Sequence, residues 1–249
     1  MKALSRWVVM VLLAGLALQL YFVGRIALMS LLDPESTAFE RSEAYQVSLN
    51  TGARQWRQQW VPYEALSDNL KRAVIASEDG SFLEHDGVDI EALEKAWEKN
   101  AKAEERAEKL MSRLAASPSK TPVVKAPRIF GGSTITQQLA KNLFLSGERT
   151  LLRKGQELVL TLALEVLLDK QRILEIYLNN VEWGEGVFGA EAAAQHYYRK
   201  PAAKLSAMEA ARLAVMLPRP KYFQNRLNSG YLASRASTIA ARMRGVEVP

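Results

Sequence analysis

The sequence predicts a mainly α-helical domain that follows a single N-terminal transmembrane helix. From about Leu66 onward, apolar residues recur at helical spacing in one segment after another. Residues 7–24 carry no formal charge and form a run long enough to cross a bilayer. Strand-like alternation is scarce, and residues 44–49, AYQVSL, are the only weak strand candidate. The predicted fold class is therefore mainly α.

The apolar run 7–24 is expected to be an uncleaved membrane anchor. Its eighteen residues would form a helix about 27 Å long, close to the hydrocarbon thickness of a bilayer. No good small-x-small cleavage site precedes Arg25, so residues 1–32 are predicted to remain as the anchor. Lys2 and Arg6 predict a cytoplasmic N-terminus, although Arg25 on the far side weakens the charge asymmetry. The alternative is a buried helix of a globular core, which the length and the charged flanks disfavour.

Helices of the domain are predicted from their caps and apolar stripes. Ser67 or Asp68 can cap a first helix that buries Leu70, Ala73 and Val74 and stops at the Glu-Asp pair before residue 80. A Ser-x-x-Glu capping box begins the last predicted helix, and two prolines end it. Further helices are expected over residues 90–114, 134–144, 151–168, 170–179, 190–198 and 206–217.

Composition narrows the possible partners. The chain has no cysteine among its 249 residues, which excludes a disulfide framework and a thiolate metal site. Its formal charge of +6 indicates an acidic partner, such as nucleic acid, an anionic membrane surface or a phosphorylated substrate. Nucleic acid ranks last, because the anchor places the basic domain outside the cytoplasm.

Residues 95–127 differ from their surroundings. They begin as a charged helix and end in a stretch rich in Ser, Pro and Lys that cannot pack a core. One interpretation is a solvated connector; the other is a basic, partly apolar flap that touches the membrane, with Leu110, Met111 and Leu114 on one face. We therefore expect an anchor at 1–32, a juxtamembrane segment at 33–60, and a domain at 61–249 with a mobile basic insertion at about 95–127.

The stretch RIFGGSTITQQLAKN, residues 128–142, carries many small hydrogen-bonding side chains at a predicted helix start. Gly131 and Gly132 permit unusual backbone conformations and close approach of a ligand, while Thr134 and Gln137 have capping-box spacing. Free N–H groups at a helix N-terminus favour an anion. Lys141 lies one turn after Gln137, and Arg149, Arg153 and Lys154 follow soon after. The alternative is a turn, its caps and a solvated basic surface.

Carboxylates and a histidine complete the candidate site. Glu78 and Asp79 close the first domain helix, and Glu157 stands four residues after Arg153, which predicts an ion pair on one helical face. His85 is either a core histidine hydrogen-bonded to the Glu78 loop, which we favour, or a general base.

Five blocks in order give the sequence a family resemblance: EDGSFLEHDGVD (78–89), GGSTITQQLAKN (131–142), RKGQE (153–157), RILEIYLNNVEWG (172–184) and GAEAAAQHYYRK (189–200). They resemble the signature blocks of the peptidoglycan glycosyltransferases, which also form the polymerising domain of class A penicillin-binding proteins. The resemblance covers roughly residues 61–217, and the chain looks like a monofunctional, membrane-anchored member. Residues 102–128 form a longer stretch than in many relatives.

The resemblance implies a two-lobed fold with a lysozyme-like α-helical lobe and a smaller membrane-proximal lobe. It also implies that the enzyme polymerises lipid II into β-1,4 glycan strands by inversion, releasing undecaprenyl pyrophosphate. The implied location is the inner membrane of a Gram-negative cell, single-pass, with a periplasmic catalytic domain. Expected partners are lipid II, the growing strand, the membrane and other proteins of cell-wall synthesis or division. A lysozyme-like lytic enzyme and a non-catalytic membrane-tethered scaffold are the alternatives.

Residue roles also follow from the resemblance. Glu78 would be the general base, and Lys141, Arg149 and Arg153 would hold the donor pyrophosphate. Glu157 would either orient the basic residues or help a divalent cation, Mg²⁺ or Mn²⁺, near the pyrophosphate; no organic cofactor is expected. The expected catalytic residues are Glu78 and Glu157, and the expected substrate-binding residues are Asp79, Phe82, His85, Ser133, Thr134, Gln137, Gln138, Lys141, Asn142, Arg149, Arg153 and Lys154.

Overall fold

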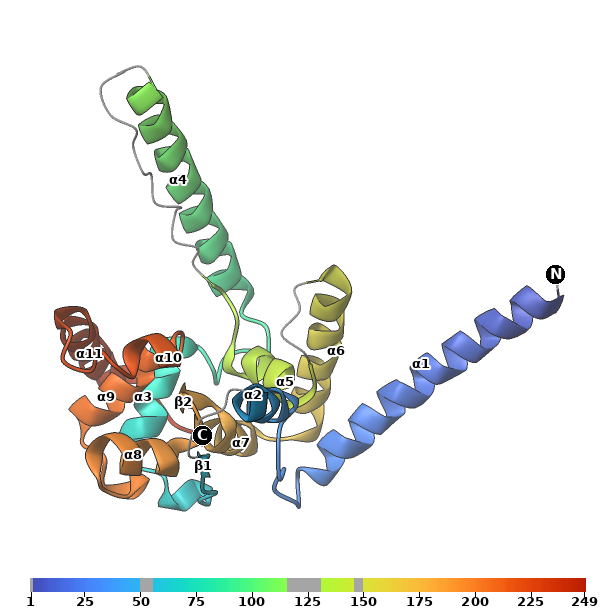
Figure 1. Cartoon of the computed structure of the whole chain (residues 1–249), viewed down its shortest axis with the longest axis horizontal. Helices are drawn as coiled ribbons and strands as arrows, with labels where there is room; N and C mark the ends of the chain where they lie inside the picture. The colour runs from blue at the N-terminus through green and yellow to red at the C-terminus, as the bar shows by residue number, and fades with distance from the viewer. Residues whose placement is uncertain (1, 50–55, 116–130, 146–149) are drawn as a thin grey trace.

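The computed structural model describes residues 2–49, 56–115, 131–145 and 150–249, and it confirms the mainly α prediction (Figure 1). In these described ranges, short 3-10 turns lie at Tyr63–Ala65, Ala202–Lys204 and Met243–Gly245. The strands are β1 Arg57–Gln58, β2 Glu182–Gly184 and β3 Val187–Phe188. The helices are α1 Lys2–Leu28, α2 Ala38–Leu49, α3 Asp68–Glu78, α4 Ile90–Ala115, α5 Ile135–Phe144, α6 Leu151–Leu167, α7 Lys170–Asn180, α8 Ala190–Tyr198, α9 Ala207–Met216, α10 Pro220–Phe223 and α11 Gly230–Arg242.

Local capping explains where the predicted helices begin. Ser67 caps α3, because its side chain accepts a hydrogen bond from the Leu70 N–H. Reciprocal capping boxes begin α5 at Thr134 and α9 at Ser206, as the sequence predicts. The predicted helices from residue 67 to residue 217 are all present, with ends that agree to within a residue or two.

The strand prediction for residues 44–49 is wrong, because these residues belong to α2. Thr37 and Glu40 form a reciprocal cap at the start of this helix: the Thr37 hydroxyl accepts from the Glu40 N–H at 3.0 Å, and the Glu40 carboxylate accepts from the Thr37 N–H at 2.7 Å. This Thr-x-x-Glu signal outweighs a short apolar alternation. The observed sheet is small, with β3 in the centre, parallel to β1 and antiparallel to β2.

Part of the predicted juxtamembrane segment, residues 33–60, folds onto the domain. Helix α2 packs against α5, and Arg57 in β1 pairs with Val187 in β3. The Gln58 amide donates to the Glu40 carboxylate at 2.9 Å, which ties the end of the segment to its beginning. This segment therefore contributes to the body of the domain.

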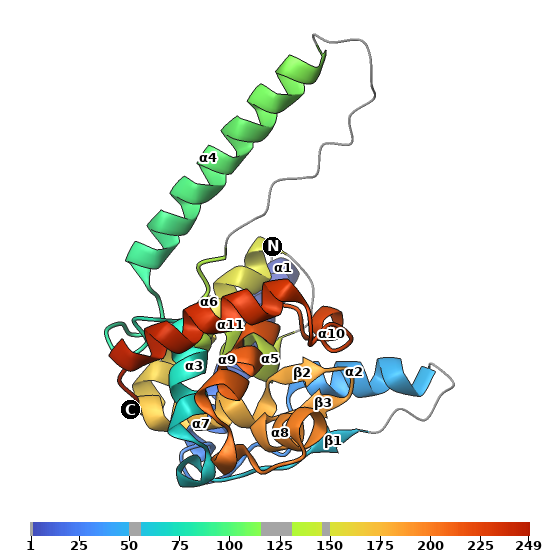
Figure 2. The ribbon, with the colours of Figure 1, turned by 90° about the vertical axis from the view of Figure 1, so that its left-hand side faces the viewer.

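The domain helices form two packed groups around a shared buried core. Helices α3, α9 and α11 pack together, while α5 packs on α6, and α7 contacts α5, α6 and α8 (Figure 2). The side chains of Leu70, Ala73 and Val74 on α3 have no exposed surface, as their inward spacing predicts. Helix α11, which the sequence did not predict, covers both α3 and α9.

Helix α4 projects away from this body (Figures 1 and 2). It begins at the loop after α3, and salt bridges between residues four apart, such as Glu91 to Lys95 and Glu98 to Lys102, run along it. Its exposed apolar residues include Trp97, Leu110 and Met111. The Ser, Pro and Lys-rich end of the insertion, residues 116–127, and the side chain of Leu114 lie outside the described part of the structure.

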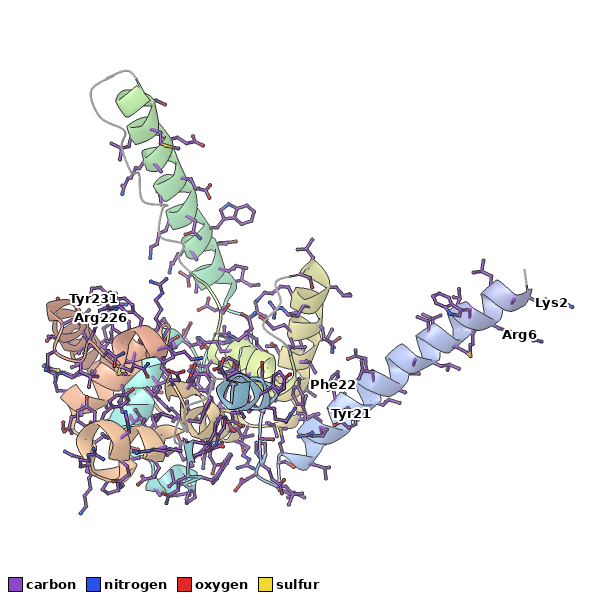
Figure 3. All side chains as sticks on the ribbon, in the orientation of Figure 1. Lys2, Arg6, Tyr21, Phe22, Arg226 and Tyr231 are labelled. Atoms are coloured by element: carbon purple, nitrogen blue, oxygen red, sulfur yellow. The ribbon has the colours of Figure 1, made fainter. Side chains whose placement is uncertain are left out.

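Helix α1 is long and apolar enough to cross a membrane, by length and composition. Lys2 and Arg6 lie at its far end, while Tyr21 and Phe22 lie toward the domain (Figure 3). The end near the domain is docked: Ile26 is fully buried, and the rings of Phe22 and Phe144 meet edge to face with centroids 5.3 Å apart. These contacts fix the direction in which the helix leaves the domain.

A pair of glutamines adds a polar link between α1 and α6. The Gln19 amide donates to Gln156 at 2.8 Å, and Gln156 donates back to Gln19 at 3.1 Å. Gln19 is the strongly polar residue in the apolar run, and a polar side chain in a membrane helix is costly unless it finds a partner. The reciprocal pair therefore specifies which face of α1 contacts α6.

We expect Gln19→Leu and Gln156→Leu to destabilise the docked anchor non-additively. Each single change leaves the other amide without its partner, so each should cost about 0.5–1.5 kcal/mol, and the double variant should cost little more than either. The measurement is a double-mutant cycle on the free energy of unfolding in detergent micelles. Ser5→Ala combined with Gln156→Leu serves as the control and should be additive; additivity in the Gln19 cycle would contradict the pairing.

Candidate active site

Glu78 lies in a cleft at the C-terminal end of α3. The cleft has a volume of about 340 Å³ and is lined by the end of α3, the start of α4 and the residues that precede α5. The lining includes Glu78, Asp79, Ser133 and Thr134 from the predicted set, together with Arg242 from α11. Residues of the first and second sequence blocks therefore line the same cleft.

Hydrogen bonds hold the Glu78 carboxylate in this cleft. Its Oε2 accepts from the Gln138 amide at 3.0 Å, and its Oε1 accepts from the Ser77 hydroxyl at 3.3 Å. Burial raises the pKa of Glu78, and the charge of Asp79 raises it further, while the Gln138 and Ser77 hydrogen bonds and the charge of Arg235 lower it. The net shift is upward, which is the direction expected for a carboxylate that takes up a proton near neutral pH.

Asp79 is buried and joins the first block to α5. Its Oδ2 accepts from the Ile135 N–H at 2.9 Å, so the anion that we expected at this helix N-terminus is a carboxylate of the protein itself. Its Oδ1 lies 2.8 Å from His85 Nε2. His85 Nδ1 accepts from the Gly87 N–H at 3.1 Å, which places the ring proton on Nε2 and directs it at Asp79.

The geometry supports the interpretation of His85 as a hydrogen-bonded core histidine. Burial lowers the pKa of His85, and the hydrogen bond to Asp79 and its charge more than offset this, so the net shift is upward. Phe82 is fully buried, with the Lys170 ammonium 4.7 Å from its ring centroid. Lys170 also donates to the His85 carbonyl at 2.6 Å. The arrangement gives Phe82 and His85 a role in holding the loop, because neither side chain opens broadly to the cleft.

Gly87 is the residue of this loop whose backbone conformation and close packing require a glycine. It has φ of +85°, and a Cβ at this position would lie 2.6 Å from the Thr161 methyl group and 2.9 Å from the Glu165 side chain. Its carbonyl accepts from the Thr134 hydroxyl at 2.7 Å. A glycine here lets the first block pass close to both α5 and α6.

A metal ion is not required to explain the group Asp79, His85 and Asp89. One ligand atom from each lies within 4.8 Å of the others. Asp79 and His85 already use these atoms in hydrogen bonds, and Asp89 accepts from the Ala92 N–H at 2.7 Å and from the Ser81 hydroxyl. Asp89 therefore caps the start of α4, while Asp79 and His85 are hydrogen-bonded to each other.

Glu157 is buried on α6 between two cations. Its Oε2 accepts from Arg153 at 2.8 Å, which confirms the predicted ion pair, and its Oε1 accepts from Lys154. The expected alternative, a divalent cation beside Glu157, does not fit these residues, because both oxygens are occupied and a dication would face two positive charges. Arg153 Nε is buried and has no hydrogen-bond partner among the described residues.

Lys141 on α5 belongs to the same electrostatic cluster. Its side chain reaches solvent, yet the surrounding protein lowers its pKa by desolvation. Glu157 raises this pKa, Arg153 and Lys154 lower it, and Glu78 raises it. The ammonium therefore interacts electrostatically both with the base candidate Glu78 and with the charged cluster of α6.

The other predicted residues lie in different surroundings. Thr134 and Gln137 are buried in the capping box of α5, and Ser133 is exposed at the cleft. Asn142 is half-buried on α5 next to Lys141. Arg149 lies outside the described residues.

Gly132 is needed for a different reason from the one we expected. Neither Gly131 nor Gly132 has a φ in the left-handed region. A Cβ on Gly132 would lie 3.1 Å from the Leu93 Cα, so this glycine permits close approach to α4.

Sequence reasoning missed several residues that line the cleft or act on the residues that do. Arg235 and Arg242 on α11 are seven residues apart and so share a helical face, a spacing that the sequence shows but that has no meaning until α11 is placed. Lys95 and Lys99 of α4 also line the cleft. Tyr177 lies in the fourth block, and its hydroxyl donates to Gln138 at 3.0 Å.

The comparisons with known proteins all point to one family, the transglycosylases. The family model described as transglycosylase matches residues 45–109 and 116–244. A protein named biosynthetic peptidoglycan transglycosylase from Burkholderia thailandensis is 54% identical over 236 residues, which cover 95% of this chain and 84% of the relative. Proteins of the same name from Burkholderia orbicola and Burkholderia pseudomallei are each 51% identical; the matches cover 99% and 100% of this chain and 94% and 90% of the relatives.

Gly87→Ala should destabilise the fold by about 1–3 kcal/mol, because a side chain there meets Thr161 and Glu165 and has an unfavourable φ. Gly80→Ala is the matched control, since nothing lies within 4 Å of its added Cβ. The measurement is the free energy of unfolding of both variants. Equal stability of the two variants would contradict the close packing of the first block on α6.

Proposed function

Because the chain belongs to the transglycosylase family, we propose that it polymerises lipid II into β-1,4-linked peptidoglycan strands with Glu78 as the general base. The observation that carries this assignment is the Glu78 carboxylate, held in a cleft by Gln138, with its pKa raised by burial. The family resemblance read from the five sequence blocks is confirmed by these matches. The family makes lipid II and the glycan strand its partners.

The chemistry assigned to Glu78 is a proton transfer. The 4-hydroxyl of the acceptor N-acetylglucosamine gives its proton to the Glu78 carboxylate as its oxygen bonds to the anomeric carbon of the donor N-acetylmuramic acid. The bond from that carbon to the pyrophosphate breaks with its electron pair, and undecaprenyl pyrophosphate leaves. Attack from the face opposite the leaving group converts the α-linked donor into a β-1,4 bond.

We propose that the leaving pyrophosphate is bound by the cluster formed by Lys141, Arg153 and Lys154. Glu157 positions this cluster, because its two oxygens bind Arg153 and Lys154 and a buried carboxylate restricts both side chains. The Arg153 Nε, which has no hydrogen-bond partner among the described residues, supplies a donor for a phosphate oxygen. Positive groups fixed in place bind the pyrophosphate more strongly as its negative charge grows.

This cluster also distinguishes the polymerase from the two alternatives. A lytic enzyme of the lysozyme type acts on finished glycan, which has no pyrophosphate for Lys141 and Arg153 to bind. A scaffold would need neither the cleft nor a carboxylate with a raised pKa. The polymerase uses all three features.

We further propose that the enzyme sits in the inner membrane with its domain in the periplasm. Helix α1 supplies the span, and Lys2 and Arg6 at its far end favour a cytoplasmic N-terminus. Beside α1, helix α6 presents an apolar face that fits a lipid environment. The exposed residues of this face are Leu151, Leu152, Leu158, Val159, Leu162 and Val166.

Glu78→Gln should lower lipid II polymerisation by at least about a hundredfold, because the amide keeps the size and can still accept from Gln138 but cannot accept the proton. The measurement is polymer formed from labelled lipid II by purified full-length protein in detergent. Thermal unfolding should stay close to that of the wild type. Turnover near the wild-type rate in a folded Glu78→Gln protein would remove Glu78 from its role.

Lys141→Ala should lower turnover about thirty- to nearly a thousandfold, equivalent to roughly 2–4 kcal/mol of barrier, because a charge close to the leaving group is lost. Stability should change little, since the ammonium reaches solvent. Lys204→Ala, which removes an exposed lysine from another part of the surface, is the control and should keep full activity. Normal turnover of Lys141→Ala would make this lysine part of a solvated surface.

A further inference from the structure

We propose that Tyr177 is a positioning residue that fixes the Gln138 amide so that its NH₂ group faces Glu78 and keeps this carboxylate ionised. The inference rests on the proposed function, in which Glu78 must be ionised to act as the base. It assigns a task to a buried hydroxyl that does not contact the cleft.

Three side chains form a continuous chain of hydrogen bonds. The Tyr177 hydroxyl donates to Gln138 Oε1 at 3.0 Å, and Gln138 Nε2 donates to Glu78 Oε2 at 3.0 Å. They come from three helices: Tyr177 from α7, Gln138 from α5 and Glu78 from the end of α3. Tyr177 has no exposed surface, so water does not compete for its hydroxyl.

The direction of this chain follows from the chemistry of its members. An ionised carboxylate only accepts hydrogen bonds, so the amide must turn its NH₂ group toward Glu78 and its oxygen toward Tyr177. A phenol can satisfy that oxygen because it carries a proton to donate. Burial, together with the charges of Glu78 and Asp79, raises the pKa of Tyr177 well above its ordinary value, so the phenol keeps its proton.

Without the Tyr177 hydroxyl, the amide loses its preferred orientation. A buried amide oxygen without a donor is costly, and turning the amide over would present that oxygen to the carboxylate. A carbonyl oxygen beside Glu78 favours the protonated acid, which can donate to it. Tyr177 therefore favours the ionised form of Glu78 from a distance of two hydrogen bonds.

Other charges act on Glu78 from the elements around it and stay in place when Tyr177 changes. Asp79 on the following residue raises the pKa of Glu78, and Arg235 from α11 lowers it. Lys141 from α5 also interacts with it. The remaining charged residues of the cleft are Asp89, Lys95, Lys99 and Arg242.

The sign of the pH effect is as follows. The base works only when Glu78 is ionised, so activity falls as the pH drops through its pKa. Loss of a donor that favours the ionised form raises that pKa and moves the acid limb of the pH profile to higher pH.

The test compares pH profiles of kcat/KM for lipid II polymerisation by full-length Tyr177→Phe and Tyr63→Phe. Tyr63 is the matched control, because it is a buried tyrosine whose hydroxyl donates to the Pro249 carbonyl at 2.7 Å. For Tyr177→Phe we expect the acid limb to move up by about 0.5–1 pH unit, with a three- to tenfold lower rate below the limb. The rate above the limb should stay within about twofold of wild type, and Tyr63→Phe should keep the wild-type limb.

Two outcomes would overturn the proposal: an unmoved acid limb in a folded Tyr177→Phe protein, or a rate lowered equally at every pH. If Tyr177→Phe does not fold, Gln138→Met replaces it, since it removes the donor to Glu78 and leaves the tyrosine in place. Its limb must then move up, and an unmoved limb overturns the proposal. Glu78→Gln measured in parallel separates the two hypotheses. An active Glu78→Gln protein refutes the base assignment. An inactive Glu78→Gln protein together with an unmoved acid limb for Tyr177→Phe refutes only the positioning role of Tyr177.

Discussion

The bond between the Asp79 carboxylate and the first turn of α5 is the interaction on which the site depends. Asp79 accepts from the Ile135 N–H and from His85, so it joins the end of α3 to the start of α5 and to the loop between them. Glu78 is the preceding residue, and this bond therefore sets its distance from Gln138. The carboxylate also satisfies the helix dipole, which leaves the substrate pyrophosphate to side-chain cations elsewhere.

Helix α5 contacts the base candidate at one position and the cationic cluster one turn later. Gln138 touches the carboxylate, whereas Lys141, three residues later on a neighbouring part of the same face, interacts with the cluster of Arg153, Lys154 and Glu157. Burial pushes the pKa of Glu78 up and that of Lys141 down, because desolvation disfavours the charged form of each group. The separation lets a base and a cationic site coexist without forming one closed ion pair.

Short-range chemistry was readable from the sequence, and long-range placement was not. The caps at Ser67, Thr134 and Ser206 and the Arg153–Glu157 pair involve residues within four positions, so spacing alone predicts them. The contact of Tyr177 with Gln138 joins residues 39 positions apart and depends on how α7 packs against α5. The anion at the α5 N-terminus illustrates the limit: helix chemistry predicted that an anion would lie there, but only the tertiary fold identifies it as Asp79.

Two adjacent residues of α6 connect the anchor helix α1 to the basic cluster. Gln156 binds Gln19 of α1, and Glu157, the next residue, binds Arg153 and Lys154. Successive residues of a helix point about 100° apart, so one turn of α6 faces the anchor on one side and the basic cluster on another. A tether alone would raise the local concentration of enzyme at its membrane substrate. A docked tether also fixes the angle at which the basic cluster meets the membrane surface, where the pyrophosphate of a lipid-linked donor must lie.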